Sequence, residues 1–171
     1  MISSRQRKYA LVTGASSGIG REYAAQLAAK GYDLVMAGNR DEENRAAARE
    51  IAARYGVRTL PLCMDLSEPD AAVKLHAETS ARGIEIGVLV CNAGIAQQKL
   101  FTDTTDEDWR RLMAVDLDGA FYACRAVLPG MVHQKYGRIL LVSSMWGQTG
   151  GSCEVAYSAA KAGLIGLGKA L

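Results

Sequence analysis

The feature that most limits how this chain can fold is a regular alternation between short β-rich runs and longer stretches of helical periodicity. The β-rich runs lie at 9–12, 33–37, 58–63, 87–91 and 138–143. The helical stretches lie at 18–30, 41–55, 67–82, 105–132 and 155–171. This alternation is typical of repeated βαβ units, so we expect an α/β fold built on a doubly wound parallel sheet of the Rossmann type.

Particular residues predict where several of these helices begin and end. Gly31 and Gly56 stand where helices should stop. Ser67 is the expected N-cap of the third helix, with Pro69 in its first turn. Pro129 should bend or end the fourth helix, because proline lacks the backbone N–H that a helix interior needs.

The last helical stretch reaches Leu171 without a cap, a glycine stop or a polar tail, and no further β-rich run follows it. A chain of 171 residues is long enough to bury one core but short for two domains. We therefore expect a single domain over residues 1–171 that is C-terminally incomplete.

The composition excludes several classes of protein. A net charge of +2 with intermixed acidic and basic residues gives no support for a nucleic-acid surface. No apolar run approaches the ~20 residues that a membrane span needs. The four cysteines form no C-x-x-C pair, so no metal site is expected. We expect a cytoplasmic protein that acts on a small molecule and binds neither nucleic acid nor membrane.

A glycine-rich turn, Thr-Gly-Ala-Ser-Ser-Gly-Ile-Gly, joins the first β-rich run to the first helix. This is where a dinucleotide pyrophosphate meets a helix N-terminus. Gly14 permits the tight turn, Gly18 allows close approach to phosphate, and Gly20 allows the helix to pack against the strand. The candidate cofactor-binding residues of this turn are Gly14, Ser16, Ser17, Gly18, Ile19 and Gly20.

Four motifs, in order, carry a resemblance to a known family. After the G-x-x-x-G-x-G turn come Asp65-Leu66, then Asn92-Ala93-Gly94, and finally Tyr157 and Lys161 four residues apart. In this order the chain resembles the short-chain dehydrogenases/reductases, and its second half resembles the 3-oxoacyl-acyl-carrier-protein reductases. The resemblance implies a dinucleotide-binding, catalytic domain and an NAD(P)-dependent reaction between a carbonyl and its alcohol. It also implies adenine contacts from Asp65 and Leu66, and a cofactor ribose bordered by Asn92, Ala93 and Gly94.

The end of the second β-rich run bears on which nicotinamide cofactor is bound. An acidic residue there would bind the ribose hydroxyls and repel a 2′-phosphate, and Gly38-Asn39-Arg40 contains none. The Arg40 guanidinium could pair with a 2′-phosphate, although relatives that use NADP often carry the basic residue at the place of Asn39. We expect NADP(H), with NAD(H) as the alternative.

The expected catalytic groups are Tyr157, Lys161 and Ser144. A spacing of four on a helix places Tyr157 and Lys161 on one face. The resemblance implies that the Tyr157 hydroxyl exchanges a proton with the substrate oxygen while the Lys161 ammonium stabilises the tyrosinate. Both residues are also expected to bind the cofactor. Ser144 would donate a hydrogen bond to the reacting oxygen, and Ser143 is the less favoured candidate.

Asp116 departs from the family pattern. The family usually has an asparagine here, which holds a water that relays protons to the lysine. A carboxylate could accept a hydrogen bond from that water but could not donate one, and its charge would favour the protonated lysine. We expect Asp116 to slow the proton relay or to shift its pH optimum.

Other properties follow only from weaker signals. Lys135 and Arg138 could meet an acidic carrier protein, or they could be solvated charges in a turn. Gly163, Gly166 and Gly168 offer a small-residue surface, so a homo-oligomer, dimer or tetramer, is expected. No residue pattern in the sequence identifies the substrate.

The alternative to a reductase is a non-catalytic cofactor-binding module or an inactive truncated reductase. Two features motivate it, Asp116 and the expected absence of C-terminal elements. Such a protein would bind the cofactor without turnover.

Overall fold

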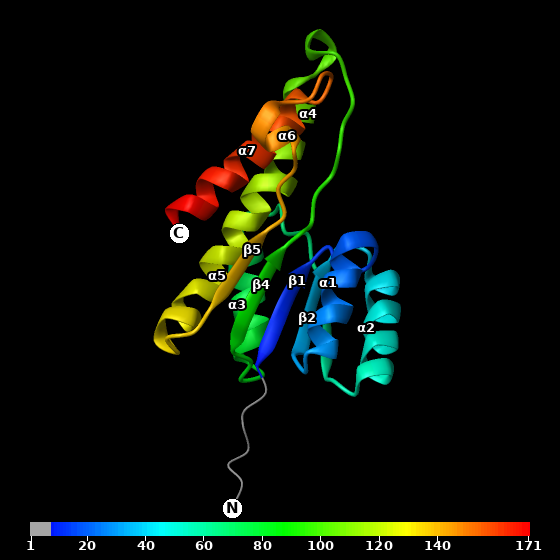
Figure 1. The fold of residues 1–171 in the computed structure, drawn as a ribbon, viewed down its shortest axis with the longest axis vertical. Coiled ribbons are helices and arrows are strands. Elements are labelled where there is room, and N and C mark those ends of the chain that lie inside the picture. The colour runs from blue at the N-terminus through cyan, green and yellow to red at the C-terminus, as the bar shows by residue number, and fades with distance from the viewer. Residues whose placement is uncertain (1–7) are drawn as a thin grey trace, which may run out of the picture.

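A parallel five-stranded sheet forms the centre of the molecule in the computed structural model, which describes residues 8–171 (Figure 1). The strand order is β3-β2-β1-β4-β5. The strands are β1 (Tyr9–Thr13), β2 (Asp33–Gly38), β3 (Thr59–Cys63), β4 (Ile86–Cys91) and β5 (Arg138–Leu141). Each β-rich run of the sequence is thus a strand, and the expected doubly wound α/β fold is confirmed.

Helices cover both faces of the sheet. The helices are α1 (Gly18–Ala29), α2 (Asp41–Tyr55), α3 (Ala71–Ser80), η1 (Phe101–Asp103), α4 (Asp106–Met113), η2 (Ala114–Asp118), α5 (Gly119–His133), α6 (Trp146–Thr149) and α7 (Val155–Ala170). Helices α1 and α2 pack on one face, while α3, α5 and α7 pack on the other (Figure 1). Among residues 8–171, no helix is long and apolar enough to cross a lipid bilayer.

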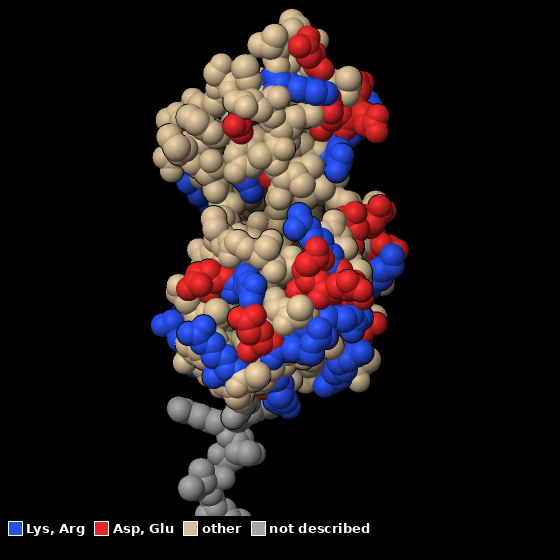
Figure 2. Space-filling view, turned by 90° about the vertical axis from the view of Figure 1, so that its right-hand side faces the viewer, with Lys and Arg blue, Asp and Glu red and all other residues tan. Residues whose placement is uncertain are grey.

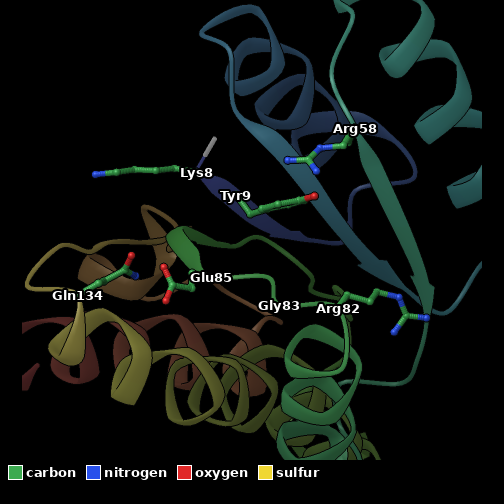
Figure 3. Close-up of a pocket in the computed structure, with 7 residues that line it drawn as sticks. All are labelled: Lys8, Tyr9, Arg58, Arg82, Gly83, Glu85 and Gln134. Atoms are coloured by element: carbon green, nitrogen blue, oxygen red, sulfur yellow. The ribbon is translucent and has the colours of Figure 1, made fainter. Parts of the chain in front are cut away.

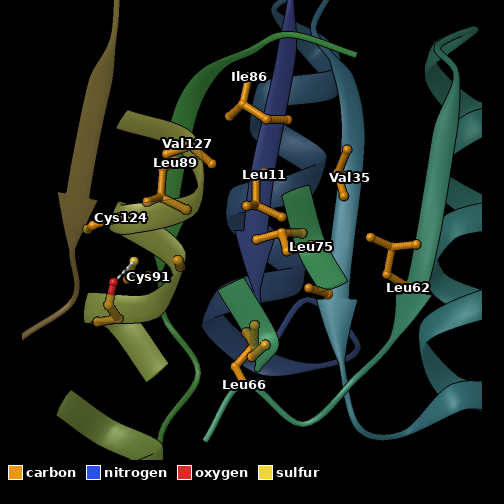
Figure 4. Close-up of a cluster of buried hydrophobic side chains, with 14 of the residues drawn as sticks. Leu11, Val35, Leu62, Leu66, Leu75, Ile86, Leu89, Cys91, Cys124 and Val127 are labelled. Atoms are coloured by element: carbon orange, nitrogen blue, oxygen red, sulfur yellow. Dashed lines mark hydrogen bonds between the residues drawn. The ribbon is translucent and has the colours of Figure 1, made fainter. Parts of the chain in front are cut away.

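The pleat of the strands divides the core into two apolar layers. Along β1, Ala10 and Val12 point to the α1 and α2 side, while Leu11 points to the α3 and α5 side. Figure 4 shows the second layer, where Leu11 and Leu89 of the sheet lie with Leu75 of α3 and Val127 of α5. Burying each such leucine or valine stabilises the fold by roughly 1.5–3 kcal/mol.

The strand order reverses between β1 and β4, and this reversal decides where a ligand can bind. From β1 the chain proceeds outward to β2 and β3, then returns to add β4 and β5 on the other side. The connections therefore diverge at the carboxyl ends of β1 and β4, which opens a crevice between them. The glycine turn follows β1 and Asn92 follows β4, so the two motifs lie at this crevice.

One predicted helix start is wrong, and one of two expected effects of a proline is not seen. Helix α3 begins at Ala71 rather than after Ser67, because the Ser67 hydroxyl donates to Asp65 Oδ1 at 2.6 Å and does not cap the helix. Pro129 lies inside α5, and the helix continues beyond it to His133. Pro129 cannot donate the intrahelical hydrogen bond of an ordinary residue, yet α5 continues past it, so the proline does not end the helix.

The stretch predicted as one helix over 105–132 is divided by a π-helical turn. Helix α4 starts with a capping box, in which Thr105 Oγ1 accepts from Asp108 N and Asp108 accepts from Thr105 N. The π turn η2 then widens the helix over Ala114–Asp118 before α5 begins. Such turns often occur at functional sites, and this one carries Asp116.

The glycine stripe of α7 packs mainly inside the chain. A Cβ on Gly163 would lie 2.8 Å from Leu117 Cδ2, and one on Gly168 would lie 3.2 Å from Leu141 Cδ1. Only Gly166 of the three has open space around it. The stripe therefore fits α7 against its own neighbours, and it gives less support to a homo-oligomer than the sequence suggested.

Candidate functional site

A cleft of about 500 Å³ lies at the carboxyl ends of β1, β2, β3 and β4. Viewed from the α2 side, Figure 2 shows a hollow between a lower body dense in charged side chains and an upper part with fewer of them. Most of the predicted cofactor-binding residues line the cleft: Gly14, Ser16, Ser17, Asn39, Arg40, Asp65, Leu66, Asn92, Ala93 and Gly94. Its size lies within the range of small-molecule and cofactor sites.

The glycine turn forms the floor of this cleft. Gly14 has a φ of 65°, and a Cβ there would lie 2.9 Å from the Ala93 Cα. Gly18 has a φ of 54°, and a Cβ on Gly20 would collide with the Gly14 carbonyl oxygen. The Ser17 side chain does not cap α1, so the first N–H groups of that helix are left for a ligand. The turn therefore has the backbone geometry that a pyrophosphate requires.

Thr13, which the sequence reasoning missed, ties the two sides of the cleft together. Its buried hydroxyl accepts from Asn92 N at 2.9 Å and from Ala93 N at 3.0 Å. In return, the Asn92 side-chain amide donates to the Thr13 carbonyl at 3.2 Å. These contacts join residues far apart in sequence, and a threonine at the end of a strand gives no signal of them. Asn92 thus supports the turn as well as bordering the cleft.

The segments after β2 and β3 form the side of the cleft where the family resemblance leads us to expect the adenosine. Arg40 lies here, and the neighbouring Asp41 carboxylate binds Arg45 Nε at 2.8 Å within α2. Asp41 therefore does not occupy the Arg40 guanidinium. Hydrogen bonds from the Ser67 hydroxyl and backbone N–H lower the pKa of Asp65, which keeps its carboxylate ionised as an acceptor.

Two of the predicted catalytic residues, Tyr157 and Lys161, lie close together beside the inner end of the cleft. The Lys161 ammonium lies 5.4 Å from the centre of the Tyr157 ring, and it would lie 3.2 Å from a Cβ on Gly94. The Ser143 hydroxyl donates to the Lys161 carbonyl at 2.7 Å and so fixes α7 to the end of β5. The Ser144 oxygen only accepts, from Trp146 N at 3.2 Å, so its own proton is available. This difference favours Ser144 over Ser143.

Asp116 contacts the lysine directly. Its side chain is fully buried, and Oδ2 lies 3.2 Å from Lys161 Nζ, whose own side chain is 5% exposed. Oδ1 accepts from Ile95 N at 2.7 Å, whereas Oδ2 has no well-aligned hydrogen-bond donor in the part of the chain that the structure describes. Burial raises the pKa of Asp116, and the Ile95 N–H and the Lys161 charge only partly oppose it. Lys161 also donates to the Val142 carbonyl at 3.2 Å.

A second cavity, of about 310 Å³, lies at the opposite end of the sheet (Figure 3). Its cations already have partners: Arg58 binds Asp33, and Lys8 lies over the Tyr136 ring at 3.0 Å. Arg82, at the same end, binds Glu78. The cavity contains no predicted catalytic or cofactor-binding residue, so the cleft at the carboxyl ends is the candidate site.

Lys135 and Arg138 lie away from the candidate site. Lys135 follows α5 with a φ of 51°, and Arg138 is the first residue of β5. The chain then runs along β5 before it reaches Ser144, so the two cations are at the amino end of that strand. A carrier protein that met them would dock at the other end of the sheet from the catalytic groups.

Comparison with known sequences gives a consistent result. A family model described as short chain dehydrogenase matches residues 8–171. The 3-oxoacyl-[acyl-carrier-protein] reductase of Aquifex aeolicus is 40% identical over 97% of this chain, and that of Escherichia coli is 37% identical over 96%. The matched regions are 67% and 66% of those proteins, so the chain spans about two thirds of their length.

Solved structures show the same similarity. A metagenomic short-chain oxidoreductase in complex with NADP superposes with a TM-score of 0.90 at 34% identity, covering 95% of this chain and 74% of that one. L-sorbose reductase from Gluconobacter frateurii, complexed with NADPH and L-sorbose, superposes with a TM-score of 0.92 at 27% identity, covering 96% and 63%.

Proposed function

The chain belongs to the short-chain dehydrogenase/reductase family, and on this premise we propose that it is an NADP(H)-dependent oxidoreductase acting on a carbonyl or alcohol. The observation that carries the proposal is the position of the Lys161 ammonium. It lies 5.4 Å from the centre of the Tyr157 ring and 3.2 Å from where a Gly94 Cβ would be, and Gly94 lines the cleft; this supports a proton-transfer group at the edge of the cleft.

The residues of the cleft fit a dinucleotide. Gly14 forms the tight turn, and its own N–H donates to the Ala37 carbonyl at 2.8 Å. Ser16 and Ser17 line the cleft at the start of α1, where their backbone N–H groups would bind the pyrophosphate, while Asp65 and Leu66 would hold the adenine. The Arg40 guanidinium would pair with a 2′-phosphate, which is the reason for proposing NADP(H) over NAD(H). When bound, this cofactor supplies the hydride that is added to the carbonyl carbon or removed from the alcohol.

The protein's own residues handle the proton. In the reducing direction the Tyr157 hydroxyl donates its proton to the substrate oxygen, and the Ser144 hydroxyl donates a hydrogen bond to the same oxygen. The Lys161 ammonium stabilises the tyrosinate that results. Asp116 would act through Lys161: its ionised carboxylate weakens the field of the ammonium at Tyr157 and so makes the tyrosinate harder to form.

The substrate class we propose is a 3-oxoacyl thioester. The support comes from the reductases that match most of this chain at 37–40% identity. Carrier-protein docking at Lys135 and Arg138 is not part of the proposal, given their distance along β5 from Ser144. A cytoplasmic location and assembly as a dimer or tetramer are proposed on the family resemblance alone.

The test is a fluorescence titration with NADPH and NADH, followed by an assay of NADPH oxidation with a short 3-oxoacyl thioester and a panel of ketones. Tighter binding of NADPH and turnover of at least one carbonyl support the proposal. Tighter binding of NADH would refute the cofactor preference. Cofactor binding without turnover of any carbonyl would favour the alternative, a non-catalytic binding module, which Asp116 makes a specific possibility.

A further inference from the structure

The cleft contains a second guanidinium group, that of Arg111, which no motif in the sequence indicated. Arg111 lies on α4, one helical turn before Val115, and both side chains line the cleft. Asp65 and Leu66 of the segment after β3 line the same cleft. Arg40 enters it from the segment after β2. The two arginines therefore come from different walls.

Arg111 has no partner among residues 8–171, although helix α4 offers it one. Glu107 lies four residues earlier, the spacing at which Asp106 binds Arg110 at 3.0 Å on the same helix, yet Glu107 and Arg111 form no ion pair. Asp108 is engaged by Lys99 at 2.6 Å. The Arg111 guanidinium thus lies beside the cleft without a hydrogen bond or ion pair to any described residue.

Arg111 also has room to move. It lines a neighbouring cavity of about 260 Å³ together with Ile95, Gln97 and Leu112. Asp108 also lines this cavity, and its carboxylate is bound by Lys99 and Gln97. The exposed Arg111 side chain therefore borders two open spaces. A ligand in the cleft could draw it inward without breaking an existing contact.

We propose that Arg111 stacks its guanidinium on the adenine ring of the bound dinucleotide and so closes the adenosine end of the cleft. The inference rests on the proposed function, since it needs adenine to lie beside Asp65 and Leu66. A guanidinium is planar and weakly hydrated, and it stacks on aromatic faces better than an ammonium does. Leu66 and Val115 line the same cleft and would offer apolar contacts to a flat ring, while Arg40 would pair with the 2′-phosphate.

The test measures binding of NADPH and of adenosine 2′,5′-bisphosphate to the wild-type protein and three variants. Arg111→Ala should weaken both ligands by the same factor, about fivefold to tenfold. Arg111→Lys should weaken binding nearly as much as Arg111→Ala, because an ammonium keeps the positive charge but has no planar group that can stack on adenine. Arg110→Ala is the matched control: Arg110 is adjacent, 74% exposed and bound to Asp106 at the surface, and its loss should change neither ligand.

Three outcomes would overturn the inference. The first is unchanged affinity in Arg111→Ala. The second is full retention in Arg111→Lys, which would mean that only the positive charge matters. The third is weakened NADPH binding with unchanged binding of the bisphosphate, which would place the contact away from adenine. Failure of the wild-type protein to bind NADPH would instead refute the proposed cofactor, so the two failures are distinguishable.

Discussion

Two buried aspartates, Asp33 and Asp116, lie at opposite ends of the sheet, and their surroundings differ sharply. Asp33 begins β2, and its fully buried carboxylate is held by Arg58, which is 66% exposed. The Arg58 Nε donates at 2.7 Å and the Arg58 backbone N–H at 2.8 Å. Asp116 is equally buried, but its partner Lys161 is buried too, and one of its oxygens lacks an aligned donor.

The difference indicates that the Asp33–Arg58 pair stabilises the fold, whereas the Asp116–Lys161 pair belongs to the candidate site. At the amino end, a forked guanidinium and a backbone N–H satisfy the carboxylate, and water reaches the arginine, so the pair costs little. At the carboxyl end, two charges are buried together with incomplete hydrogen bonding, which is an expensive arrangement. Charge geometry of this kind is typical of functional sites. Four variants test the contrast, from the largest expected effect to the smallest.

Tyr157→Phe removes the proposed proton donor and should lower kcat by about 10²- to 10⁴-fold. The fold should be unaffected, because only a hydroxyl is lost, and NADPH binding should weaken far less than kcat falls. Steady-state kinetics and a cofactor titration measure this, with Tyr55→Phe at the end of α2 as the control. Retained turnover in Tyr157→Phe would mean that the carboxyl end of the sheet is not where this proton is transferred.

Arg40→Ala tests an arginine that, unlike Arg58, has no acidic partner within the described residues 8–171. Loss of a charged hydrogen bond to the 2′-phosphate should weaken NADPH binding by about 10- to 100-fold. NADH binding should stay constant, which provides the internal control. Equal loss for both cofactors would contradict a contact with the 2′-phosphate.

Arg58→Ala should act on stability alone. Removing the guanidinium leaves Asp33 buried with the Arg58 backbone N–H as a remaining donor. We expect the free energy of unfolding to fall by about 1–2 kcal/mol, less than for a fully buried pair because water reaches Arg58. Thermal unfolding measures the loss, and Arg49→Ala on the exposed side of α2 is the control. A changed pH–rate profile in Arg58→Ala would contradict the distinction between the Asp33–Arg58 and Asp116–Lys161 pairs.

Asp116→Asn should act on pH dependence. An asparagine keeps an acceptor for Ile95 N but removes the negative charge beside Lys161, so the tyrosinate forms more readily. The ascending limb of the pH–rate profile for alcohol oxidation should move to lower pH by about one unit. Asp118→Asn, at an exposed position of the same turn, is the control.

The raised pKa of Asp116 sets the pH range of this difference. Because burial raises it above the ordinary value of 3.8, the carboxylate becomes neutral at a higher pH than an exposed aspartate would. The wild-type protein and Asp116→Asn should therefore differ above that raised pKa and converge as the pH falls through it. Identical profiles throughout would show that the charge at Asp116 does not reach Tyr157.

Much of the fold was predictable, because strand runs and helical periods report burial directly. The limits of α2 were predicted without error, since Gly56 in the left-handed conformation ends the helix. The sequence failed at Ser67, whose hydroxyl had a better partner in Asp65. It also missed the π turn, because the pattern of apolar residues in 105–132 does not change where the helix widens.

The sequence by itself determined the parallel sheet and the glycine turn, because each depends on local periodicity or short spacing. The spacing of Tyr157 and Lys161 placed them on one helix face, and only the family resemblance implied that they transfer a proton. Only the tertiary structure decided that Thr13 joins β1 to Asn92, that Asp116 meets Lys161 directly, and that Arg111 is left uncommitted beside the cleft. Those facts depend on which distant side chains remain unpaired when the elements pack, and no one-dimensional pattern encodes them.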